Sequence, residues 1–306
     1  MQTKIPAELK AAVPSTQWGK VLSATPVVMT VIATLLAGLA NSEMTKAQYL
    51  RALAAQQQSK AGDQWGFFQA KRLRGAIQLG TLDGIQAAGE RRAVDAAGLR
   101  AFAAALPDPE PVQAALGHLL SGRLPEAAPA PAPDARVQAA LDGVEQGLPD
   151  AEVAARLHAT PADAIADALR AAQDRVRAFD ARLRPIVAHG DRLGDALEAA
   201  DGARRALDRD FTVLRLRFAS QRYDAEARLN QAVAVLHELQ VRQSNLAAER
   251  HHRRSQRFFY GMLGAQAAVI IATFALAAHR RNFLWSLAAA AGLGALAFAV
   301  YVFVYL

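Results

Sequence analysis

The chain of 306 residues contains no cysteine. This absence excludes disulfide bonds, thiolate nucleophiles and cysteine-based metal sites. The sequence also lacks a glycine-rich phosphate loop, an HExxH helix and a G-x-S-x-G motif, and its histidines are scattered. We therefore expect no catalytic residue, no metal ligand and no bound cofactor, and we predict that the protein is not an enzyme.

Charged side chains are missing from three long apolar runs, residues 21–40, 258–278 and 283–306. Each run is close to the ~20 residues that a helix needs to cross ~30 Å of hydrocarbon. In lipid, every backbone polar group must bond within the protein, which favours helices. The runs predict three transmembrane helices. Because they carry no charged residue, they argue against a proton relay or an ion-coupled transporter.

Proline is absent from residues 27–106 and 186–306, and ten of the thirteen prolines lie between Pro107 and Pro185. Proline costs about 3 kcal/mol or more inside a helix, so long helices are expected outside that middle region and not within it. We predict an all-α membrane protein: three transmembrane helices, a long antiparallel helical or coiled-coil stalk, and a proline-rich helical tip. The expected segments are a tail (1–20), a transmembrane helix (21–40), a first stalk arm (41–106), an acidic tip with an Ala-Pro linker (107–185), a second arm (186–257) and two transmembrane helices (258–278, 283–306).

The two arms differ in the strength of their helical pattern. Apolar residues of the second arm recur in steps of three and four, as in a coiled coil. These are Leu207, Phe211, Leu214, Phe218, Leu229, Val233, Leu236 and Leu239. The first arm has a weaker stripe made of Trp65, Phe67, Phe68, Leu73, Ile77, Leu82 and Ile85. Several glycines interrupt this stripe and predict breaks in the helix.

Charge is distributed unevenly along the soluble part. Residues 41–106 carry a formal charge of +4, residues 107–185 carry −4, and residues 186–257 carry +3. Basic ends near the membrane suit anionic lipid headgroups. Residues 150–169 have the rhythm of a helix-turn-helix, but Asp163 and Asp167 would repel DNA phosphates. We expect a helical hairpin there and no nucleic-acid partner.

A basic run directly precedes the second apolar run. It forms either a lipid-headgroup collar that responds to pH, because paired histidines can charge near pH ~6, or an ordinary juxtamembrane anchor. Its residues are Arg250, His251, His252, Arg253, Arg254 and Arg257. Small residues recur within the last two apolar runs, and such stripes predict close helix packing in a hairpin or between subunits. They include Gly261, Ala265, Ala268, Ala272, Gly292 and Ala295.

Residues 59–72 combine large aromatics with polar side chains. They form either a contact surface for a partner or another copy, or the core of the stalk itself. The candidate residues are Asp63, Gln64, Trp65, Phe67, Phe68, Gln69 and Lys71. This segment, together with residues 279–285, resembles the signature of a bacterial family of uncharacterised multi-pass membrane proteins, known only as a domain of unknown function. The resemblance covers about residues 20–75 and 255–306, although Gly66 stands where the family usually has a larger residue. It implies an N-terminal span, a helical soluble region and a C-terminal hairpin, and no chemistry.

We expect a non-enzymatic integral membrane scaffold or assembly protein, whose stalk forms a homo-oligomer or organises a membrane-protein partner. The alternative is a channel or transport-accessory subunit, favoured by the small-residue stripes and by Pro26 in the first apolar run. The expected location is a bacterial inner (plasma) membrane, with membrane lipids as partners. Short basic segments favour the cytoplasmic side and would place the stalk in the periplasm, whereas the run 250–257 favours the reverse. The short segments contain Lys4, Lys10, Lys20, Arg280 and Arg281.

Overall fold

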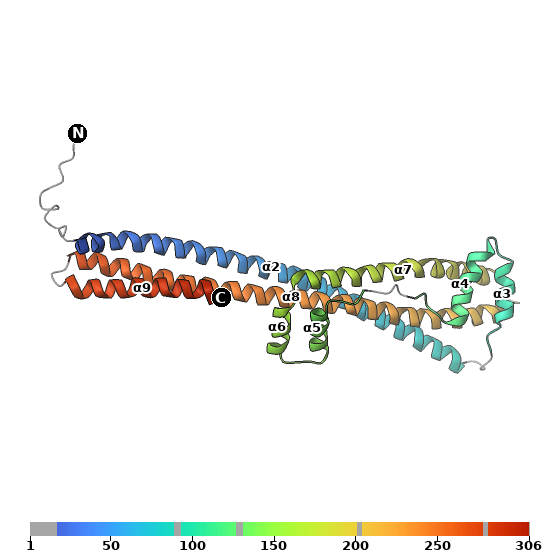
Figure 1. The fold of residues 1–306 in the computed structure, drawn as a ribbon. Coiled ribbons are helices and arrows are strands. Elements are labelled where there is room, and N and C mark those ends of the chain that lie inside the picture. Colours follow the sequence, from blue (N-terminus) through green and yellow to red (C-terminus); the bar gives the residue numbers. More distant parts are fainter. Residues whose placement is uncertain (1–16, 89–92, 127–130, 201–203, 278–280, 306) are drawn as a thin grey trace, which may run out of the picture. The chain divides into compact units, whose positions relative to one another are not determined.

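A computed structural model describes residues 17–88, 93–126, 131–200, 204–277 and 281–305. Every regular element in these ranges is an α-helix and none is a strand, which confirms the all-α prediction (Figure 1). Most of the expected tail, part of the Ala-Pro linker, and His279 and Arg280 lie outside the described residues. The helices are α2 (Gln17–Ala88), α3 (Ala96–Ala104), α4 (Pro109–Ser121), α5 (Ala135–Glu145), α6 (Asp150–Ala159), α7 (Ala162–Glu198), α8 (Arg205–Ala277) and α9 (Arg281–Tyr305).

Two of these helices, α2 and α8, are long and apolar enough to cross a membrane by length and composition. Helix α9 contributes a shorter apolar stretch within the described residues, Ser286–Tyr301. The chain divides into two compact units. Unit 1 comprises residues 1–53 and 244–306, and unit 2 comprises residues 54–243.

Unit 1 packs three helical segments through small side chains. Ala33 of α2, Ala265 of α8 and Ala295 of α9 form one buried cluster. Leu36 and Phe258 lie in a second cluster of the same segments. The helices approach closely: a methyl group added at Gly292 of α9 would lie 2.8 Å from Met29 Sδ of α2. Such close approach requires alanine or glycine at the contact points.

Unit 2 has a core of large side chains contributed by α3, α4, α7 and the first part of α8. Leu99, Leu116, Leu193 and Phe211 are fully buried within it. Asp95 is the N-cap of helix α3, and its side chain accepts a hydrogen bond from the Gly98 backbone N–H at 2.8 Å. Such a cap satisfies one of the unpaired amides of the first helical turn. A short hairpin of α5 and α6 packs on the start of α7 through residues that include Val137, Val153 and Ile165.

Two expectations from glycine and proline are wrong. Helix α2 continues without a break through the glycines of residues 62–84. Gly75 lies at the contact with α8, because a methyl group there would be 3.5 Å from Tyr223 Cβ. Helix α7 runs for 37 residues through Pro185, so the proline-containing middle does hold a long helix. Burial of the neighbouring Leu183 and Ile186 stabilises it, since tertiary packing supplies most helical stability.

The second arm also differs from its predicted extent. Residues 186–198 belong to α7, and α8 begins at Arg205. Most positions that the three-and-four spacing places inward on α8 are nevertheless buried, with Phe211, Leu214, Val233 and Leu239 all below 5% exposed. Leu207 and Leu229 are partly buried.

The inward face of α2 is different from the predicted stripe. Leu73 and Ile77 are 63% and 55% exposed. Leu82 of the predicted stripe is buried. Most of the other buried positions recur every seventh residue as alanine: Ala33, Ala40, Ala47, Ala54 and Ala61. Alanine allows close helix contact, so shape and not hydrophobicity selects this face.

Candidate functional site

The structure divides the candidate contact residues of α2 into a group that faces α8 within unit 2 and a group that is exposed. The Trp65 indole N–H donates to Glu238 Oε1 of α8 at 2.7 Å. Its ring meets Phe68 edge to face, with 5.4 Å between the ring centroids. Lys71 forms an ion pair with the buried Glu226 of α8. These three residues of α2, with the half-buried Gln64, thus belong to the interior contact between α2 and α8.

The other candidates, Asp63, Phe67 and Gln69, are exposed. Phe67 is 56% exposed and adjoins a row of uncharged residues, two of which, Leu73 and Ile77, belong to the stripe predicted for the first arm. We call this row the outer α2 face. Its members follow one another in steps of four and three and are all exposed: Gly66, Ala70, Leu73, Ile77, Gly80, Gly84 and Ala87.

The outer α2 face is unusual within unit 2. Among the described residues of this unit, every exposed large hydrophobic side chain lies on α2, between Phe67 and Leu79. Leu79 points to another side of the helix, where it lines a groove of about 430 Å³ beside Gln221 and Asp224 of α8. A methyl group added at Gly66, Gly80 or Gly84 would meet no atom within 4 Å. The glycines of this face therefore leave open space beside Leu73 and Ile77.

The basic run before the second apolar run is also divided by the structure. The ring of His251 points inward, with Nδ1 2.6 Å from Glu43 Oε2 of α2. Lys46 donates to the other oxygen of the Glu43 carboxylate at 2.8 Å. Burial raises the pKa of Glu43, but these two partners outweigh it and hold the pKa below its ordinary value. One turn along, the Ser255 hydroxyl donates to the Ala40 carbonyl at 2.8 Å.

The remaining members of the run face other directions. Arg253 pairs with Glu249 at 3.0 Å, one turn earlier on α8. His252 Nε2 lies 3.1 Å from Gln256 Nε2. Arg250, Arg254 and Arg257 have no carboxylate within ion-pair distance in the described part of the chain. The predicted collar therefore divides into an inward histidine, a histidine beside Gln256, a paired arginine and three arginines without an acidic partner.

All six candidate helix-packing residues, Gly261, Ala265, Ala268, Ala272, Gly292 and Ala295, are buried in unit 1. The large apolar side chains of the same helices point outward. Exposed examples are Val27, Val31 and Leu35 on α2, Ile270 and Phe274 on α8, and Leu293 and Val300 on α9. Among its described residues, unit 1 thus has mostly small residues inside, with Leu36 and Phe258 as large exceptions, and many large apolar residues outside. Unit 2 shows the opposite pattern.

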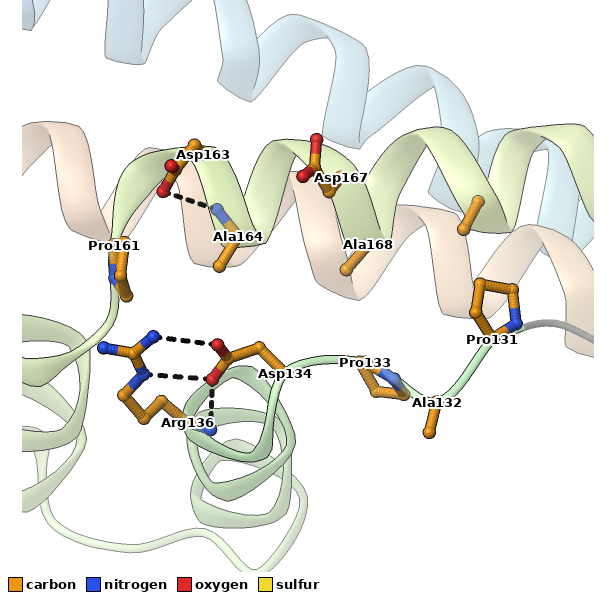
Figure 2. Close-up of a pocket in the computed structure, with 11 residues that line it drawn as sticks. Pro131, Ala132, Pro133, Asp134, Arg136, Pro161, Asp163, Ala164, Asp167 and Ala168 are labelled. Atoms are coloured by element: carbon orange, nitrogen blue, oxygen red, sulfur yellow. Dashed lines mark hydrogen bonds and ion pairs between the residues drawn. The ribbon is translucent and has the colours of Figure 1, made fainter.

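The segment with a helix-turn-helix rhythm forms α6 and the start of α7, beside α5. A hollow of about 360 Å³ lies at this point. Its lining residues include Asp134, Arg136, Asp163 and Asp167, which Figure 2 shows as sticks. Asp134 accepts hydrogen bonds from the Arg136 side chain and backbone, which lower the pKa of Asp134 to about 2. Arg170, the first basic residue of α7, is paired with Asp167.

The described residues contain no group of three or more histidine, cysteine or acidic side chains that could hold a metal ion. No family model, curated protein or solved structure matches the chain. The family resemblance of residues 59–72 and 279–285 therefore stays a prediction.

Proposed function

We propose that the protein is a multi-pass scaffold of the bacterial inner (plasma) membrane, without enzymatic activity, that assembles through its outer α2 face. The proposed spans are residues 21–40, 258–278 and 283–306, and the proposed stalk consists of the α2 and α8 segments of unit 2 in coiled-coil contact. The inverted pattern of unit 1 supports the spans. In water, exposure of so many large apolar side chains would cost roughly 1.5–3 kcal/mol each relative to burial, whereas lipid removes this cost.

The observation that carries the scaffold function is the outer α2 face. A soluble surface that exposes a contiguous apolar row without charge marks an interaction site. We assign this face to a second copy of the same helix. Steps of four and three are the spacing of a helix-pairing seam. In a parallel pair, Ile77 and Leu73 would meet their own counterparts, and the flanking glycines let the backbones approach.

The size of the face is consistent with assembly on a membrane. From Gly66 to Ala87 the helix rises about 32 Å at ~1.5 Å per residue. One helix pair of this length buries less than the ~1,200 Å² typical of stable complexes. Copies anchored in one bilayer are held at a high effective concentration, so a small interface suffices. A channel function has less support, because the close glycine contacts of unit 1 fill the space between its helices.

The chain has no cysteine, so single engineered cysteines can test this pairing directly. We expect Ile77→Cys to form a cross-linked dimer in native membranes with a short thiol-reactive reagent. Leu79→Cys is the matched control, since Leu79 is also exposed but points to another side of α2. Adding Leu73→Glu should abolish the Ile77→Cys dimer. Equal cross-linking at both positions, or adducts only with proteins of other masses, would refute self-association through this face.

A further inference from the structure

The rim of unit 1, residues 41–53 and 244–257, carries an excess of positive charge. Six lysine and arginine residues stand against two glutamates, which leaves a formal charge of +4. Both glutamates are already engaged. Glu43 accepts hydrogen bonds from Lys46 and binds His251, and Glu249 pairs with Arg253. Arg51 also lies 3.9 Å from Glu249. Among the described residues of the rim, this leaves Arg250, Arg254 and Arg257 without an acidic partner.

This charge is concentrated on three arginines of α8, which we call the arginine row. Arg250, Arg254 and Arg257 lie on successive turns, four and three residues apart, and so share one side of the helix. The buried Nε of Arg254 has no hydrogen-bond partner among the described atoms. Like charges at this spacing repel one another. An anion in contact with all three guanidinium groups would offset this repulsion.

The arginine row begins at the end of the apolar part of unit 1. Gly261 and Gly264 of α8 pass Ala295 of α9. The guanidinium of Arg257 lies over the ring of Tyr301, 5.8 Å from its centroid. Arg254 and Arg250 lie on the next two turns of α8, on the side of Arg257 away from the apolar run. A tyrosine and arginines at the end of an apolar segment are typical of a membrane–water boundary.

We infer that the arginine row binds the phosphate group of an anionic phospholipid. This inference rests on the proposed membrane spans. Guanidinium groups match phosphate oxygens in charge and geometry and can donate two hydrogen bonds to one phosphate. A phosphodiester held at the boundary would neutralise the repulsion within the row and supply an acceptor for Arg254. The ring of Tyr301 contacts the guanidinium of Arg257 at the end of the site nearest the apolar run. His251 and Arg253 keep their protein partners and take no part.

The test is native mass spectrometry of the full-length chain in detergent, titrated with phosphatidylglycerol or phosphatidylcholine. Each arginine near a bilayer surface contributes about fivefold in affinity for anionic lipid. We expect phosphatidylglycerol to bind at least about tenfold more tightly than phosphatidylcholine, on the same scale. The variant Arg250→Gln/Arg254→Gln/Arg257→Gln should bind the two lipids within about twofold of each other.

The matched control removes the same charge from unit 2. Arg170, Arg177 and Arg228 each pair with an aspartate in the exposed part of a helix. Replacing these three with glutamine should leave the lipid preference intact. Loss of preference in this control would show a net-charge effect and overturn the inference.

Two further readouts separate the alternatives. Displacement of phosphatidylglycerol by millimolar inorganic phosphate would assign the row to free phosphate and overturn the lipid site. Retention of the wild type in carbonate-washed membranes tests the membrane spans separately. Equal binding of both lipids by a protein that is retained would overturn the arginine-row inference alone, whereas release into the supernatant would overturn the spans.

Discussion

The inverted interior of unit 1 predicts that filling a buried alanine is harmful and that trimming a large exposed side chain is harmless. Ala268 of α8 is fully buried, and Ile270, two residues later, is 56% exposed. Ala268→Leu adds three carbon atoms where helices are in contact, and overpacking of this kind costs about 1–3 kcal/mol. Ile270→Ala removes atoms that touch only the surroundings, and should change the free energy of unfolding by less than about 0.5 kcal/mol.

A single cysteine can report the opening of this bundle. Ala288 of α9 is fully buried and packs with Ala272 and Ala275 of α8. In the Ala288→Cys protein, alkylation requires the helices to separate, so its rate follows the free energy of opening. A cost of about 1–3 kcal/mol corresponds to an alkylation rate about 5 to 150 times faster. We expect this increase when Ala268→Leu is added, and a change below about twofold when Ile270→Ala is added.

The reverse order would refute the reasoning. Fast alkylation with Ile270→Ala and an unchanged rate with Ala268→Leu would mean that Ile270 lies inside a bundle of different packing. The assignment of the outward side chains to lipid would then fail together with the proposed spans.

Three further predictions concern single side chains. Since the pKa of Glu43 lies below its ordinary value, its contribution to the free energy of unfolding is full above pH 4.5 and declines as the pH falls below that; Glu43→Gln should flatten this decline in urea unfolding measured as a function of pH. Phe211→Ala should destabilise unit 2 by about 3–5 kcal/mol in urea unfolding, and the exposed Phe67→Ala by less than about 0.5 kcal/mol. Trp65→Phe leaves Glu238 without its donor and should cost about 1–3 kcal/mol, with a smaller effect in a Glu238→Gln background; equal effects in both backgrounds would contradict the hydrogen bond.

Much of the fold could be predicted from local patterns in the sequence. The helical class follows from proline-free segments with period-3.6 patterns, and the inward positions of α8, such as Phe211 and Leu239, follow from large apolar residues at three-and-four spacing. Both signals depend on neighbours along a single helix. The buried alanines of α2 also follow a pattern in the sequence, since alanine recurs at every seventh position from Ala33 to Ala61. Hydrophobicity alone, however, favours the larger Leu73 and Ile77 as the buried residues.

The division of the candidate residues could not be predicted, because it depends on which helices touch. Residues 63–71 have aromatic or apolar side chains on both sides of α2, and only the approach of α8 decides that Trp65 lies inside and Phe67 outside. Likewise, the sequence alone does not distinguish the six residues of the basic run 250–257, because only the contacts of Glu43 and Glu249 in the fold show which of them have an acidic partner. The sequence by itself determined that the chain is helical and that its apolar runs carry no charge, because these are properties of consecutive residues. Tertiary structure alone decided which face of each helix is buried and which cations lack a partner, because contact between distant segments selects shape and charge complementarity that no single segment contains.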